Sequence, residues 1–95
     1  MTKDEVLTEV MVGLGNVPTQ TRNTIKIHFN DVLRYLVSSG VKPHLIDIKN
    51  DFIDESCIGV ITRGVGDLWN YGNGDTKLSD YFYEGANQLR KDTNE

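Results

Sequence analysis

The residues between 64 and 80 have the types that could bind a phosphate or a cation. The segment GVGDLWNYGNG, residues 64–74, carries the glycines of a phosphate-binding loop but neither a preceding strand nor the lysine and hydroxyl pair of such a loop. Asn73, Asp75 and Asp80 follow without the alternating ligands and distal glutamate of a calcium loop. The stretch therefore predicts a turn between two helices, and a ligand loop is disfavoured. Ser79 is predicted to be the N-cap of the second of these helices, with Asp80 in its first turn.

Other residues could do acid-base, nucleophilic or metal chemistry. The acidic stretch consists of Asp47, Asp51, Asp54 and Glu55. No surrounding motif assigns it a pocket, so we expect a solvated surface that partly caps the third helix. Cys57 is expected to be a small buried hydrophobic residue. Because His28 and His44 are the only histidines available to join it as ligands, no zinc cluster is expected. We therefore expect no catalytic residue, no metal and no cofactor, and predict that the chain is not an enzyme.

Four helices are predicted to position these residues, over approximately 3–14, 19–39, 55–71 and 79–91. Apolar residues recur three and four apart in them, which is the pattern of one buried helix face. Segment 43–54 is expected to be a short helical turn or loop, because a lone strand there would lack a partner. The predicted fold class is all-α, a small bundle of about four helices in a single domain, 1–95.

The third predicted helix contains three glycines, and aromatic residues surround its end. Gly59, Gly64 and Gly66 each cost about 1 kcal/mol relative to alanine inside a helix. Close approach of another helix or subunit would offset that cost, and a bend is the alternative. The aromatic set consists of Trp69, Tyr71, Tyr81, Phe82 and Tyr83. These rings would staple two helices within the subunit, with some ring surface left to face a neighbour.

Length and charge limit the function classes. A chain of 95 residues buries a small core, so assembly with partners would add stability. Its longest apolar run is far shorter than the roughly 20 residues of a membrane span, and its N-terminus lacks the pattern of a signal peptide. The net charge of −4 argues against a dedicated DNA-binding domain, since that affinity comes largely from cations that displace phosphate counterions.

The segment IGVITRGVGDLWNYGNGDTKLSDYFYEGANQLR, residues 58–90, carries a specific combination of residues. The combination is Arg63-Gly64-Val65, Asp67-Leu68-Trp69-Asn70-Tyr71-Gly72, Gly74, Lys77-Leu78-Ser79, Phe82 and Gln88-Leu89. With it the chain resembles the head-tail connector, or adaptor, family of tailed bacteriophages and prophages of Gram-positive bacteria, which is also labelled as DNA-packaging proteins. The strong resemblance covers about a third of the chain, and the N-terminal helices match in order, length and the LVSSGV ending of the second.

The resemblance implies a structural virion protein at the head-tail interface, made in the bacterial host cytoplasm. Such a subunit forms a homo-oligomeric ring, commonly twelve-fold, beneath the portal protein. The ring extends the DNA channel, lets DNA pass without sequence-specific binding, and docks stopper, head-completion or tail proteins. Connectors contact the portal through their C-terminal segment, here Leu89, Arg90, Lys91, Asp92 and the tail that follows. The candidate interface residues are Arg63, Gly64, Asp67, Trp69, Tyr71, Lys77, Phe82, Gln88, Leu89, Arg90 and Lys91.

A second function stays open from the sequence. A chain of this size could be a small DNA-packaging or regulatory binding module that contacts terminase or nucleic acid transiently. The net charge of −4 and the lack of a basic helix count against it. Binding of DNA that weakens with added salt would favour it.

Overall fold

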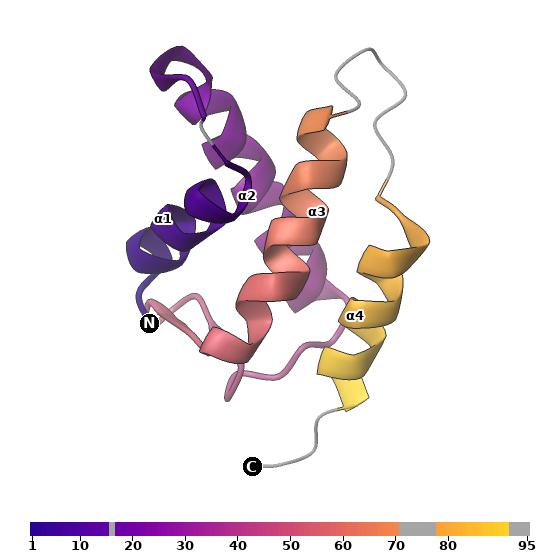
Figure 1. The fold of residues 1–95 in the computed structure, drawn as a ribbon. Coiled ribbons are helices and arrows are strands. Elements are labelled where there is room, and N and C mark those ends of the chain that lie inside the picture. The colour runs from indigo at the N-terminus through magenta and orange to yellow at the C-terminus, as the bar shows by residue number, and fades with distance from the viewer. Residues whose placement is uncertain (16, 71–77, 92–95) are drawn as a thin grey trace.

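The computed structural model describes residues 1–15, 17–70 and 78–91, and four α-helices make up most of them (Figure 1). These are α1 (Lys3–Gly13), α2 (Arg22–Ser38), α3 (Ile58–Asn70) and α4 (Asp80–Lys91). The 3-10 turns η1 (Thr19–Thr21) and η2 (Glu55–Cys57) lead into α2 and α3, and they account for the two largest differences from the predicted bounds. The predicted all-α bundle of about four helices is confirmed.

Helix α3 lies at the centre of the bundle. It packs against α1, α2 and α4, and α1 and α4 lie on opposite sides of it (Figure 1). Of the apolar residues that recur three and four apart along α2, Ile25, Phe29, Val32, Leu33 and Leu36 are buried, whereas Val37 is 40% exposed. Cys57 is buried in η2, directly before α3, as expected. The largest fully buried side chains are Phe29, Phe82, Ile25, Leu36, Ile53 and Ile61. All four helices and both strands contribute buried side chains to one core, which is the arrangement that lets a small domain hide its apolar faces.

Segment 43–54 differs from its prediction. Two short strands, β1 (Ile46–Asp47) and β2 (Phe52–Ile53), pair antiparallel, with Ile46 opposite Ile53. The expectation that a strand here would have no partner was wrong, because the partner lies within the same segment and the turn at 48–51 brings it back. Asp51 ends that turn with φ 51°, a left-handed conformation that aspartate tolerates better than most residues. Ile46 and Ile53 are buried, so the hairpin closes one end of the core.

The hairpin also holds the start of α1. The Thr2 hydroxyl accepts from the Glu5 N–H at 3.2 Å and the Glu5 carboxylate accepts from the Thr2 N–H at 2.8 Å, which is a capping box. The Asp51 carboxylate accepts from the Lys3 N–H at 2.8 Å, and the Ile53 N–H donates to the Met1 carbonyl at 2.8 Å. The first turn of α1 is thereby fixed to the hairpin, and Lys3 is held beside it.

Three carboxyl groups, on exposed Glu5 and half-buried Asp47 and Asp54, have a lowered pKa because they accept hydrogen bonds. The pKa of Glu5 is lowered by the Thr2 N–H, that of Asp47 by the Asn50 side chain and that of Asp54 by the Ser56 hydroxyl. A carboxyl whose folded pKa is below its unfolded value stabilises the fold above the unfolded pKa, and this stabilisation is lost as the pH falls through the folded pKa. Asp54 also accepts from the Ser56 N–H at 3.0 Å, so the acidic stretch does cap the turn before α3, as predicted.

The free energy of unfolding should therefore be steady near neutral pH. It should decline once the pH falls below about 5 and continue to decline below about 4, the ordinary pKa of a carboxyl group. The variant Asp54→Asn keeps a good helix-capping side chain but removes one titrating group. It should show a shallower decline in urea unfolding measured between pH 7 and pH 3. Identical slopes for the variant and the unmodified chain would contradict the role given to Asp54.

Candidate functional site

Several of the predicted interface residues meet where α3 and α4 pack together. The α3–α4 corner is defined here by Arg63, Gly64, Asp67, Ser79, Tyr81 and Phe82. Arg63, Gly64 and Asp67 lie on α3. Each of them lies against a residue at the start of α4 or directly before it. Ser79 precedes α4, and Tyr81 and Phe82 lie in its first turn.

A chain of hydrogen bonds closes the corner. Asp67 is only 7% exposed, and its carboxylate accepts from the Ser79 N–H at 2.9 Å. The Ser79 hydroxyl accepts from the Phe82 N–H at 3.2 Å, which confirms Ser79 as the residue that caps α4. A buried carboxylate is costly unless it is hydrogen-bonded, so Asp67 serves to fix the start of α4 relative to α3.

Gly64 lets α4 approach α3 closely. A Cβ at Gly64 would lie 2.7 Å from Cε1 of Phe82 and 3.0 Å from Cγ2 of Val32, closer than real Cβ contacts. A Cβ at Gly66 would lie 3.2 Å from Leu14, whereas one at Gly59 would meet nothing within 4 Å. Close approach within the subunit is therefore the reason for Gly64 and Gly66, and it does not account for Gly59.

The aromatic rings divide between the core and the surface. Phe82 is fully buried, and its ring packs at an angle against those of Tyr35 and Tyr83, with centroid distances of 5.6 Å each. Since Tyr35 lies on α2 and Phe82 on α4, the predicted stapling of two helices is confirmed for this ring. Tyr81 is 71% exposed, and the Arg63 guanidinium lies 5.3 Å from its ring centroid. Such a surface cation–π contact orients both side chains without burying them.

The remaining predicted residues do not join the corner. Trp69 is half-buried against the core. On the last two turns of α4, Leu89 is buried, Arg90 is half-buried and Gln88 and Lys91 are exposed. Tyr71 and Lys77 lie outside the described residues.

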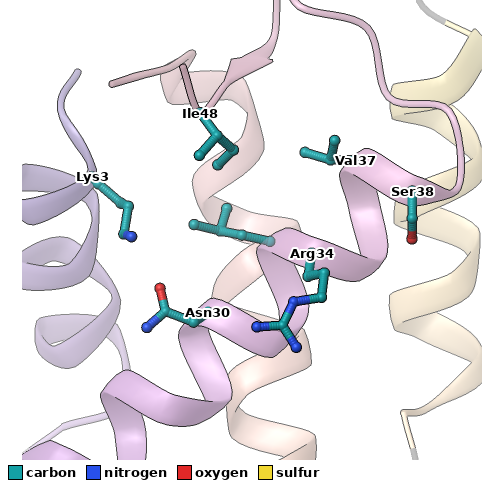
Figure 2. Close-up of a pocket in the computed structure, with 7 residues that line it drawn as sticks. Lys3, Asn30, Arg34, Val37, Ser38 and Ile48 are labelled. Atoms are coloured by element: carbon teal, nitrogen blue, oxygen red, sulfur yellow. The ribbon is translucent and has the colours of Figure 1, made fainter. Parts of the chain in front are cut away.

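A groove that was not predicted lies between α1, α2 and the hairpin turn (Figure 2). It has a volume of about 420 Å³ and is lined by Lys3, Asn30, Leu33, Arg34, Val37, Ser38 and Ile48. Figure 2 shows Lys3 entering from α1, Arg34 and Val37 from α2, and Ile48 from the hairpin turn. The groove could not be predicted from the sequence because the hairpin, which brings Ile48 over α2, was not predicted.

Within residues 1–15, 17–70 and 78–91, no three His, Cys, Asp or Glu side chains gather as they would around a metal ion. Nor does any helix in that part of the chain combine the length and apolar character needed to span a membrane. The arrangement is suited to contacts between surfaces: a rigid corner with one exposed ring, and a groove with an apolar floor.

The variant Asp67→Ala should lower the free energy of unfolding by about 1–3 kcal/mol, because the partly buried Ser79 N–H would lose its acceptor. Asp80→Ala is the matched control, since Asp80 is an exposed carboxylate in the first turn of α4 and should matter little. Urea unfolding followed by circular dichroism measures both. Equal losses for the two variants would show that Asp67 acts only through its charge.

Comparison with known proteins identifies no relative of this chain. No protein-family model, no curated protein and no solved structure matches the chain. The resemblance to head-tail connectors therefore stays a prediction that rests on the residues quoted for it.

Proposed function

We propose that this chain is a structural, non-enzymatic subunit of a phage neck. In this proposal it is a head-tail connector that forms a ring beneath the portal protein, extends the DNA channel and docks head-completion or tail proteins. Its partners are further copies of itself, the portal and the next protein of the neck.

The observation that carries the proposal is the α3–α4 corner. Arg63, Gly64, Asp67 and Phe82 belong to the residue combination that resembles the connector family, and they lie within one packed corner. Gly64 and Asp67 fix how α4 sits on α3, so these two residues of the combination act on the shape of the subunit. A ring subunit requires such a rigid shape, since small errors in each contact add up around a closed ring.

Charge supports the same function. The net charge of −4 means that a channel built from many copies would carry a strongly negative field. Such a field repels DNA phosphates, so DNA would slide past the subunits without being held.

Particles assembled without this protein test the proposal directly. We expect them to package DNA but to lose it or to fail to join tails, and electron microscopy of the heads should show portals that lack an added ring. Supplying the unmodified chain should restore both properties. Particles that lack the protein, yet keep their genomes and attach tails normally, would overturn the proposal.

The alternative binding module makes a different prediction. If the chain contacts nucleic acid, the purified protein should shift the mobility of DNA in a gel at low salt. This shift should disappear as salt is added, because the binding is electrostatic. The connector proposal predicts no shift at either salt concentration.

A further inference from the structure

The groove pairs an apolar floor with positive charge at its edges. Val37 is 40% exposed and Ile48 is 48% exposed, large fractions for aliphatic side chains on facing elements. Lys3 and Arg34 line the same groove, and the only ion pair among the described residues joins Arg34 to Asp31 at 3.7 Å with both side chains largely in solvent. An exposed pair of this kind is weak, so Arg34 can exchange it for a better partner. The groove suits an apolar or aromatic side chain flanked by carboxylates.

The chain itself presents that chemistry on α4. The acidic α4 face is defined here as Asp80, Tyr81 and Glu84, all exposed. Tyr81 and Glu84 are three residues apart on the helix and therefore neighbours, and Asp80 adjoins them. Tyr81 has the largest exposed fraction among the exposed large hydrophobic residues described, although Arg63 covers part of one ring face. Tyrosine is also among the residues that most often dominate a protein interface.

We propose that the groove receives the acidic α4 face of a second copy of this chain. Tyr81 of one copy would enter the groove against Val37 and Ile48, while its flanking carboxylates would face Lys3 and Arg34. The proposal rests on the ring-forming function above and adds the two surfaces through which the copies would meet.

The placement of the two surfaces gives the contact a direction. The groove involves α1, α2 and the hairpin, whereas the acidic face lies on α4, which is across α3 from α1 (Figure 1). Different patches on each copy make a head-to-tail contact, which leaves one groove and one acidic face free after each addition. Such a contact adds copies until a ring closes, and it gives an open filament where the rotation between copies does not close.

Charge exchange between the two surfaces is the main experiment. The groove variant carries Lys3→Glu and Arg34→Glu, and the face variant carries Asp80→Lys and Glu84→Lys. Each variant alone should associate at least about tenfold more weakly than the unmodified chain, because like charges would then face each other. Mixing the two variants should restore assembly, since every contact in an alternating mixture again joins opposite charges. Sedimentation equilibrium measures the association.

Two controls separate this contact from general effects. The variant with Arg22→Glu and Lys26→Glu changes the net charge as much as the groove variant does, but its exposed residues on α2 lie outside the groove, so its association should be nearly unchanged. Tyr81→Ala should weaken association roughly thirtyfold, as expected for an interface tyrosine. Circular dichroism melting of each variant verifies that the subunit is folded.

The outcomes distinguish this inference from the function on which it rests. Oligomers larger than a dimer that are weakened by both charge variants and restored by mixing them would support it. Assembly that is indifferent to these substitutions would overturn the inference while leaving the ring-forming function intact. An unmodified chain that stays monomeric at about millimolar concentration would also overturn it, and would assign the groove to an acidic segment of another protein.

Discussion

Replacing Phe82 with alanine should lower the free energy of unfolding by about 3–5 kcal/mol, because Phe82 is fully buried and a truncated aromatic leaves a cavity that neighbours fill only in part. The loss includes its ring contacts with Tyr35 and Tyr83. Since a small domain is stabilised by only about 5–15 kcal/mol in total, the variant should be close to unfolding at 37 °C. Urea unfolding at 25 °C measures the loss.

The control for Phe82→Ala is the residue beside it. Tyr81 lies in the same turn of α4 but is 71% exposed, so Tyr81→Ala should cost less than about 1 kcal/mol of stability. The pair therefore separates two roles of adjacent aromatic residues, one in folding and one in association. A loss at Tyr81 as large as that at Phe82 would refute the division of the rings between core and surface.

The second large effect is expected from Gly64→Ala, which should destabilise the chain by about 1–3 kcal/mol through overpacking. The added methyl carbon would lie 2.7 Å and 2.8 Å from two ring atoms of Phe82, and the ring has no free space into which to move because it is fully buried. The usual gain of about 1 kcal/mol when alanine replaces a helical glycine offsets only part of this strain. Chemical unfolding of the variant gives the net value.

Gly59→Ala is the same substitution in the same helix, and it should have the opposite sign. A Cβ there meets nothing within 4 Å, so only the gain in helix propensity remains, about 0.5–1 kcal/mol. Combining Gly64→Ala with Phe82→Leu adds a second check, because a smaller side chain at 82 should relieve part of the clash and make the two changes non-additive. Destabilisation by both glycine substitutions would indicate a backbone requirement in place of close packing.

The helices and the cap of α4 could be predicted because their signals are local. Apolar spacing identified the buried face of α2, and Ser79 was identified as the cap of α4 from its position before an acidic first turn. Gly64 was recognised as unusual inside a helix, but the sequence could not say which side chain it makes room for. That partner, Phe82, is 18 positions away, and only the fold brings the two together.

The hairpin and the groove could not be predicted because they depend on distant contacts. Strands of two residues give no useful alternation, and Ile46 and Ile53 are buried by the rest of the core rather than by each other alone. Gly85 was overlooked for a similar reason: a Cβ there would lie 2.8 Å from Val60, on another helix. Tyr35 was likewise not placed with the aromatic set, since its ring neighbours lie far along the chain.

The fastening of α1 to the hairpin bears on the order of folding. Asp51 bonds the Lys3 N–H across 48 positions of sequence, and the Met1 N–H group bonds the Ile53 carbonyl across 52. Closing so long a loop is entropically costly, so these bonds should form after the local turns of α2 and α3. We hypothesise that α1 docks late, and that removing the Asp51 side chain would speed unfolding while leaving the folding rate nearly unchanged. Stopped-flow kinetics of Asp51→Gly, which removes the side chain but allows the left-handed φ of the turn, would decide, because slowed folding would place α1 in the nucleus instead.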